Sequence, residues 1–365
     1  GWMPWETQKD DPRAVAHRDS YLKNAQRQIN NRGQTHEKAI VQFSVELSEY
    51  NAQIDAGETM KNPWKQLSPP IITQPADLGH QYPAHIYNAM IHPIRGYGIR
   101  GAIWYQGERN AKNVPQAAHY RVQLPRLIEF YRKTWHEQSG GNTDRQFPFY
   151  FTQLPSWNPP QTKAVEGLEA PWAVSREMMR LIAEEVPNTG TAVSIDTGDA
   201  VQLHPKNKRP IGIRHAYLAL KRVYGRDIVE TGPRYRSHEV VDGNVVVKFD
   251  RIGSGLMGAR EGELGAFALA GEDRVWHKAQ AQITDSGSVK LASPEVPKPV
   301  AIRYGWAMNP SQQNLLYNRE GLPASPFRTD DWPLFDPDAD LVEVLKPKKP
   351  DDYIDRDWNR PKMTQ

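Results

Sequence analysis

Apolar and polar positions follow two different patterns along this chain, and the first lies between residues 98 and 225. Three apolar runs there predict β-strands at 98–106, 147–155 and 191–196. Three segments with an apolar residue at every third or fourth position predict helices at 117–138, 172–186 and 210–225. Because strand and helix alternate, this α/β region predicts a parallel sheet with helices on its faces.

The second pattern begins after Gly225. Short segments that alternate apolar and polar residues, bounded by Gly, Asp and Pro, lie at 239–255, 265–271, 275–294 and 299–307. No helical period separates them, so we expect an all-β, sandwich-like unit. The predicted organisation is an α/β domain over 1–225, a smaller all-β domain over 226–333, and a charged, proline-rich tail over 334–365 that forms a surface strap or a disordered end.

The first hundred residues carry weaker signals. Two polar, helix-permissive segments at 20–31 and 38–57 predict two helices, and a proline-rich connection at 62–83 predicts a long loop. A short amphipathic helix is expected at 84–96. The chain starts without an initiator Met, a basic segment or an apolar segment, so no signal peptide is visible and we expect an internal start.

Composition and charge argue against several classes of protein. The 46 Lys and Arg nearly balance 43 Asp and Glu over 365 residues, and both signs are interspersed, which argues against a nucleic-acid partner. No run of about 18 apolar residues occurs, so we expect no membrane span. The absence of Cys excludes disulfides, thiolate nucleophiles and Cys-based zinc sites. The 11 Trp and 15 Tyr suit a sugar-binding cleft, and they suit a protein core equally well.

Two loops that follow predicted strands hold the residues that could carry chemistry, since ligands of parallel α/β sheets gather at the carboxyl ends of the strands. His204 lies in the loop 196–208 beside Pro205, and its imidazole could take a proton from a nucleophile and return it to a leaving group. Glu108, in the loop 106–110, could orient that histidine as the third member of a triad. The alternatives are a surface-loop histidine and a glutamate that is ion-paired with a neighbouring Arg.

The same first loop offers hydrogen-bond donors for a developing negative charge. Gln106 and Asn110 carry amide N–H groups, and Gly107 lets a backbone N–H approach closely. Such donors form an oxyanion hole in acyl transfer, although each of these residues is also an ordinary turn residue.

The nucleophile has no comparable candidate. No Gly-x-Ser-x-Gly motif occurs, Ser254 is flanked by glycines but belongs to the all-β region, and Ser156 and Ser175 lie beside apolar segments without a glycine turn. No His-x-x-x-His pattern or carboxylate cluster accompanies His204, so we expect neither a metal ion nor a cofactor.

Several blocks of the chain resemble the sialate O-acetylesterase-like family of the SGNH hydrolase superfamily. "IRGAIWYQGERNA" is similar to that family's Trp-Tyr-Gln-Gly-Glu-Ser-Asn block, and "VPNTGTAVSIDTGD" followed by "LHPKNKRPIGIRHAYLAL" is similar to its histidine block. "FPFYFTQL" and "SPEVPKPVAIRYGWAMNPSQQNLLYNREGLPASPFRTDDWP" also resemble family segments. The resemblance extends over about Lys61 to Pro333, and it implies an SGNH-type hydrolase domain.

The resemblance assigns a role to each candidate residue. His204 would be the catalytic base and Glu108 its acidic partner, while Gln106 and Gly107, together with Asn110, would contribute to the oxyanion site. The implied reaction is hydrolysis of an O-acetyl ester on a sugar or glycan through a serine acyl-enzyme, without a metal or an organic cofactor. Members of the family are commonly exported, which implies a secreted or periplasmic protein.

Three departures from the family pattern bear on this assignment. Arg109 stands where the family usually has Ser, and Gln202 lies where many members have Asp, so Glu108 or Asp199 would have to support the imidazolium. The family's Gly-Gln-Ser-Asn nucleophile block lies upstream of a segment that the first residues, "GWMPWE", resemble. We therefore expect the hydrolase domain to be incomplete at its N-terminus, with Thr35 in "RGQTHE" a poor replacement for the serine.

Two functions remain open from the sequence. The first is a carbohydrate O-acetylesterase whose isolated chain is inactive and whose own N-terminal segment, as a separate chain, is a further partner. The second is a non-catalytic carbohydrate-binding relative, which Arg109 and Gln202 favour. Five residues could line a sugar cleft or pack in a core: Trp104, Tyr105, Trp157, Trp172 and Arg176, the last as a substrate-binding residue.

Overall fold

The computed structural model describes residues 1–57, 82–284 and 287–335, without the side chains of residues 28–36. The chain divides into two compact units, one made of residues 1–98 and 129–143 and the other of residues 99–128 and the chain from 144 onward. The described part of the predicted tail is only its first two residues, so the expected strap or disordered end lies outside the described residues, as does most of the predicted loop at 62–83.

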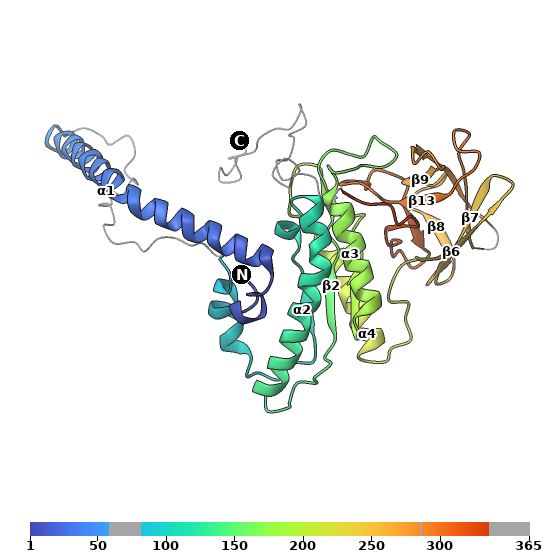
Figure 1. Ribbon diagram of the computed structural model, residues 1–365, viewed down its shortest axis with the longest axis horizontal. Helices are drawn as coiled ribbons and strands as arrows, with labels where there is room; N and C mark the ends of the chain where they lie inside the picture. The colour runs from blue at the N-terminus through green and yellow to red at the C-terminus, as the bar shows by residue number, and fades with distance from the viewer. Residues whose placement is uncertain (58–81, 285–286, 336–365) are drawn as a thin grey trace. The chain divides into compact units, whose positions relative to one another are not determined.

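The first unit contains one long helix in place of the two that were expected. Helix α1 runs without a break from Pro12 to Asp55, over 44 residues (Figure 1). The side chain of Asp11 caps it by accepting the Arg13 N–H at 3.0 Å. The prediction of two helices is wrong because Gly33, which lies between them, costs a helix only about 1 kcal/mol and does not end it.

The short helix expected at 84–96 is irregular. A π-helical turn, η2 (Tyr87–Ile91), passes directly into a 3-10 turn, η3 (His92–Ile94). Pro93 lies within η3 and has no N–H to donate, so it removes a helical hydrogen bond and disfavours a regular α-helix here. A further 3-10 turn near the start of the chain is η1 (Trp5–Thr7).

The second unit contains the predicted parallel sheet. Its strand order is β1-β2-β4, and both pairings are parallel. The strands are β1 (Ala102–Trp104), β2 (Phe149–Thr152) and β4 (Thr189–Ala192). The helices that alternate with them are α2 (Val114–Gln138), α3 (Pro171–Glu185) and α4 (Arg209–Arg222). The alternation read from the sequence is confirmed, and all four residues of β2 are buried, as a central parallel strand requires.

The strands described after α4 all pair antiparallel, which confirms the prediction of β-structure there. Two four-stranded sheets have the orders β10-β9-β13-β15 and β11-β12-β7-β6. Their strands are β6 (Arg234–Val241), β7 (Asn244–Asp250), β9 (Phe267–Ala270), β10 (Trp276–Lys278), β11 (Gln280–Ile283), β12 (Val289–Ala292), β13 (Ala301–Tyr304) and β15 (Phe327–Arg328). A short antiparallel pair joins β8 (Leu256–Gly258) to β14 (Leu316–Asn318). Before α4, a short parallel pair joins β3 (Ser156–Trp157) to β5 (Gly198–Asp199).

The two regions of the second unit share a hydrophobic core. Val193 and Ile195, which follow β4, belong to the same buried cluster as Val247 of β7 and Leu269 of β9. This shared core explains why one compact unit holds both kinds of sheet. The domain boundary at 225/226 stays a prediction, in line with the change of structure between the end of α4 and the start of β6.

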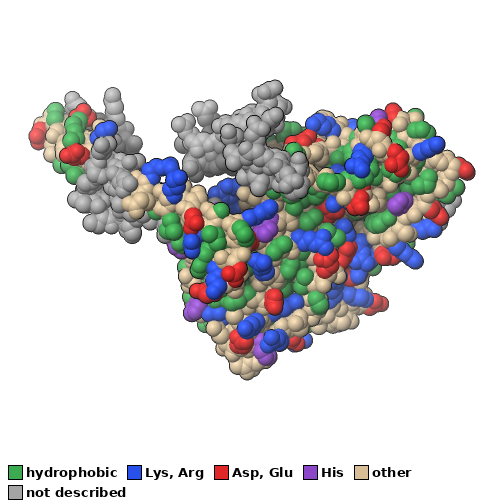
Figure 2. All heavy atoms as spheres, in the orientation of Figure 1, with side chains coloured by type: hydrophobic (Ala, Val, Ile, Leu, Met, Phe, Trp, Pro, Cys, Tyr) green, Lys and Arg blue, Asp and Glu red, His purple; other side chains and the backbone are tan. Residues whose placement is uncertain are grey.

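Surface charge is mixed on the face that Figure 2 shows, where Lys and Arg side chains lie among Asp and Glu. Among residues 1–57, 82–284 and 287–335, no helix combines the length and the apolar character that crossing a bilayer requires.

A buried histidine links α4 to the sheet. The ring Nε2 of His215 lies 2.7 Å from the Thr152 hydroxyl of β2, and the residue is 3% exposed. Burial lowers the pKa of this imidazole to about 4, so the ring is neutral at pH 7.

We expect His215 to make the fold less stable as the pH falls below about 6.5, the ordinary pKa of an unfolded histidine. Between that value and the native pKa of about 4, the unfolded state binds the additional proton. The free energy of unfolding should therefore decrease by roughly 3 kcal/mol across this range. Urea unfolding at a series of pH values should show this loss in the wild type and in His277→Gln, the control, but not in His215→Gln; equal pH slopes in all three would contradict it.

Candidate active site

The loop after β1 is held in place by helix α2. The Trp104 Nε1–H donates to the Tyr120 hydroxyl at 3.0 Å, and that hydroxyl lies 3.1 Å from the Gln106 carbonyl oxygen and 3.2 Å from its Oε1. Gln106 Nε2 donates to Asn110 Oδ1 at 2.9 Å, and Asn110 Nδ2 donates to Gln123 Oε1 at 2.7 Å. Burial raises the pKa of Tyr120, so its hydroxyl keeps the proton that it donates. These hydrogen bonds hold the loop against α2.

This hydrogen-bond chain defines what Gln106 and Asn110 can offer to a substrate. Gln106 donates one amide N–H to Asn110, and Asn110 donates one amide N–H to Gln123. Each amide nitrogen carries a second N–H. Their role in an oxyanion site stays a prediction that depends on these second N–H groups.

Gly107 is explained by close packing. A Cβ at this position would lie 2.9 Å from Met179 Cε on α3 and 3.2 Å from Leu154 Cδ2. Its N–H donates to Glu108 Oε2 at 3.0 Å, so in this geometry the donor predicted for the oxyanion site already has an acceptor. A substrate oxyanion would have to replace that carboxylate.

Glu108 is half-buried at the start of the 3-10 turn η4 (Glu108–Asn110). Within the described residues it forms no ion pair with Arg100 or Arg109, the alternative that the sequence left open. Burial raises the pKa of Tyr105 to about 12, and the negative charge of Glu108 makes a smaller contribution in the same direction. Burial lowers the pKa of Lys208, while Glu108 acts in the opposite direction. The carboxylate therefore influences a residue of its own loop and one of the histidine loop.

Lys208 connects the two predicted loops directly. Its Nζ lies 3.4 Å from the Tyr105 hydroxyl and 4.8 Å from the centre of the Tyr105 ring. The end of the histidine loop, 196–208, thus lies against the residue that precedes Gln106. No local sequence pattern indicates this contact, because its two residues are 103 positions apart.

The start of the histidine loop is anchored by a buried ion pair. Arg214 of α4 donates to both carboxylate oxygens of Asp196, at 2.7 and 2.6 Å, and also to the Val193 carbonyl oxygen at 2.7 Å. The Tyr317 hydroxyl donates to Asp196 Oδ2 at 3.1 Å. These contacts fix the point where the chain leaves β4. No motif or spacing in the sequence marks Asp196, Arg214 or Tyr317 for this role.

Asp199 stabilises a turn within the loop. Its Oδ1 accepts the N–H groups of Val201 and Gln202 at 2.7 and 3.0 Å. The Asp199 carboxylate, which the sequence offered as a support for His204, is therefore bound to backbone N–H groups of its own loop.

His204 is exposed, and the next residue, Pro205, is buried. No hydrogen bond joins His204 to another described residue, Glu108 included. The structure therefore brings the two loops together through Lys208 without forming the histidine–carboxylate bond of a triad. Catalytic hydrogen bonds are often absent or long in unliganded enzymes, so this pairing stays a prediction.

Arg176 is fully buried and surrounded by carbonyl groups. Its guanidinium donates to Leu154, Pro155 and Ala307 at 2.7 Å each and to Met308 at 3.0 Å. Burial lowers its pKa to about 9. These bonds tie the segment after β2 to the segment after β13. The guanidinium is better explained as a structural clasp than as the substrate-binding group that the sequence suggested.

Two more of the expected cleft residues also lie in the interior. Trp104 is 9% exposed and Trp172 is 1% exposed. Trp157, the partner of Trp172, has its ring centroid 5.1 Å away. Trp104 and Trp172 are therefore core residues, which is one of the two possibilities that the sequence left open for them.

None of the three serines considered as nucleophiles contacts His204. The Ser156 hydroxyl donates to the Ile195 carbonyl oxygen at 2.5 Å, and the Ser254 hydroxyl donates to Glu320 at 2.7 Å. Ser175 is buried on α3. Across the described ranges, no group of three or more His, Asp or Glu side chains is arranged to hold a metal ion.

Comparison with known proteins shows which family this chain resembles. The model of the family described as "Carbohydrate esterase, sialic acid-specific acetylesterase" matches residues 54–216. A solved carbohydrate acetylesterase from Xanthomonas citri is 38% identical, with a TM-score of 0.61 over 69% of this chain and 55% of that chain. The chain is similar to sialic acid-specific carbohydrate acetylesterases over these segments. The resemblance read from the sequence is confirmed, and the matched segment contains both the 106–110 and the 196–208 loop.

Curated relatives support the same family and show how much of them the chain represents. The sialate O-acetylesterase of Mus musculus is 34% identical over 164 residues, which are 44% of this chain and 30% of the relative. The sialate O-acetylesterase of Homo sapiens is 27% identical over 252 residues, which are 66% of this chain and 48% of the relative. The chain spans about half, or less, of the length of these relatives.

Proposed function

We propose that this chain carries the acid–base half of a carbohydrate O-acetylesterase site, for O-acetyl esters on sugars. The observation that supports the proposal best is the family match over residues 54–216, because that segment contains both candidate loops. The contact between Lys208 and Tyr105 supports it further, since it places the histidine loop against the Gln-Gly-Glu loop.

In the proposed reaction a serine oxygen attacks the acetyl carbonyl carbon while His204 takes the serine proton. The carbonyl oxygen becomes an anion that the N–H groups of Gln106, Gly107 and Asn110 bind. The bond from the acetyl carbon to the sugar oxygen then breaks, and His204 returns its proton to that oxygen. Water, deprotonated by the same imidazole, releases acetate from the serine. Glu108 stabilises the imidazolium, which requires its carboxylate to leave the Gly107 N–H.

The serine, in this proposal, comes from residues outside these 365. Ser156, Ser175 and Ser254 are not paired with His204 in the described structure. The described sheet also ends at β1, where the apolar side chain of Ile103 is 64% exposed. An additional segment packed at this edge would cover Ile103 and could deliver the nucleophile.

Acetate release from an O-acetylated sugar tests the proposal. We expect the 365-residue chain alone to release acetate at the uncatalysed rate, and the chain joined to the residues encoded upstream of Gly1 to turn over. Activity of the isolated chain would contradict the proposed origin of the nucleophile. No activity in the joined protein would contradict the esterase itself.

A joined protein that releases no acetate would favour the second candidate function, that of a non-catalytic carbohydrate-binding relative. The exposed Arg109, which adds charge beside Glu108, and the lack of a described partner for His204 favour it. A secreted or periplasmic location is part of the esterase proposal and rests on the family alone.

A further inference from the structure

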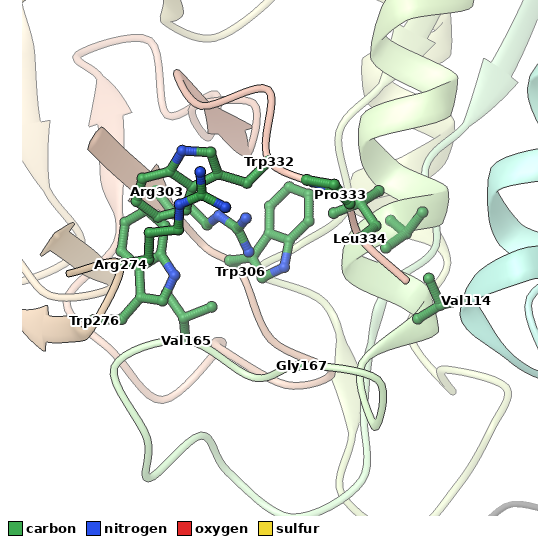
Figure 3. Close-up of a pocket in the computed structure, with 11 residues that line it drawn as sticks. Val114, Val165, Gly167, Arg274, Trp276, Arg303, Trp306, Trp332, Pro333 and Leu334 are labelled. Carbon is green, nitrogen blue, oxygen red and sulfur yellow. The ribbon is translucent and has the colours of Figure 1, made fainter. Parts of the chain in front are cut away.

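The second unit contains a hollow of about 440 Å³ that shares no lining residue with the candidate active site (Figure 3). Three indoles and two guanidinium groups gather along it, from Trp276, Trp306, Trp332, Arg274 and Arg303. The remaining wall comes from Val114, Val165, Gly167, Val174, Pro333 and Leu334. Pockets for small molecules range over about 300–1,000 Å³ and combine apolar walls with a few polar groups, as this one does.

Arg303 holds the aromatic wall in place. Its guanidinium lies 4.6 Å from the ring centres of both Trp276 and Trp306. It donates to the two carboxylate oxygens of Asp330 at 2.9 and 2.7 Å, and both side chains are buried. The charge of Arg303 is therefore already balanced, and its planar group fixes the orientation of two indoles.

Arg274 differs from Arg303 because it is exposed and has no acidic partner among the residues that the structure describes. Its guanidinium carbon lies 5.2 Å from the centre of the Trp332 ring, and no described carboxylate is within ion-pairing distance. The adjacent Asp273 instead accepts the Val275 N–H at 3.1 Å. Arg274 has a φ of 60°, an uncommon conformation for a non-glycine residue, and its N–H closes a turn onto the Gly271 carbonyl oxygen at 3.0 Å. Arg274 thus presents a cation at the edge of an aromatic pocket, and no carboxylate of the described residues balances it.

These features match one class of ligand. Indole faces pack against the C–H face of a sugar ring, and a guanidinium binds a carboxylate through two parallel N–H groups. We propose that the hollow binds an acidic monosaccharide unit, with its ring against the three indoles and its carboxylate on Arg274. This site is separate from the loops 106–110 and 196–208, and the inference does not depend on the esterase proposal.

Titration of the whole 365-residue chain with D-glucuronate and D-glucose tests this inference, because the two sugars differ only in the carboxylate. With ¹⁵N-labelled tryptophan, we expect saturable shifts of the indole N–H signals of Trp276, Trp306 and Trp332. Glucuronate should bind about tenfold more tightly than glucose, since a charged hydrogen bond contributes at least that factor. Added salt should reduce this preference.

Two variants and one control complete the test. Arg274→Ala should remove the preference for glucuronate, and Trp332→Ala should weaken the binding of both sugars, while Arg226→Ala, an exposed arginine outside the hollow, should behave as the wild type. A preference that survives Arg274→Ala, equal binding of the two sugars, or shifts only in other indoles would overturn the proposal. A His204 variant that no longer releases acetate should give the same sugar titrations as the wild type. The sugar-binding proposal and the esterase proposal can therefore fail independently.

Discussion

Replacing Arg176 by Met should lower the free energy of unfolding by about 3–5 kcal/mol. The four carbonyl oxygens that the guanidinium now satisfies would remain buried without a donor. Because these carbonyls belong to segments after β2 and after β13, the variant should also loosen the α/β sheet from the β-sheets. Urea unfolding with the wild type as reference measures the loss.

Arg180→Met is the matched control for this prediction. Arg180 lies one turn further along α3, and its ion pairs with Glu184 and Glu177 are 2.9 and 3.9 Å long. Its loss should cost no more than about 1 kcal/mol. If Arg176 served a substrate instead of the fold, the two variants would have similar stability and Arg176→Met would raise only the KM for the sugar.

Gly198→Ala should disrupt the histidine loop. Gly198 has a φ of +115°, and a Cβ at this position would lie 1.9 Å from the Ser156 carbonyl oxygen. The Cβ would be attached directly to the backbone of β5, and the Ser156 carbonyl oxygen belongs to the backbone of β3. Neither atom can therefore move aside as the end of a flexible side chain would. We expect the free energy of unfolding to fall by about 2–4 kcal/mol if the loop keeps its position. If the loop instead moves away from Ser156, most of this strain is relieved and the loss of stability is smaller.

Gly212→Ala, on α4 directly after the loop, is the control. A Cβ there meets no atom within 4 Å, and alanine favours helix, so this variant should be as stable as the wild type or more stable by up to about 1 kcal/mol. In the joined protein that releases acetate, Gly198→Ala should also lower the rate, because His204 lies six residues further along the same loop. Unchanged stability and unchanged rate would show that the loop conformation does not depend on this glycine.

The fold could be predicted where a local pattern determines the structure. The apolar run at 147–155 becomes the buried strand β2, and the alternating segments after Gly225 become antiparallel strands, because side-chain periodicity decides which face is buried. The single helix α1 was missed because polar residues and one glycine weaken a helix without ending it. Local propensity does not reveal whether two helical segments are continuous.

The site could be predicted only as separate pieces. Motif resemblance identified the loops around Glu108 and His204, and the family match supports both. The contacts that hold these loops, Lys208 to Tyr105 and Arg214 to Asp196, join residues distant in sequence and carry no local signal. The surroundings of Arg176 could not be predicted for the same reason, since nothing near it in the sequence shows that four carbonyl groups surround it.

The most direct test of the proposed site is the rate of acetate release from an O-acetylated sugar by the joined protein, compared between His204→Ala and His277→Ala. His277 lies on β10, outside both candidate loops, and its variant should keep the wild-type rate. We expect His204→Ala to lower kcat by a factor of about 10² to 10⁴, because the general base is lost. A rate for His204→Ala that equals the rate for His277→Ala would contradict it.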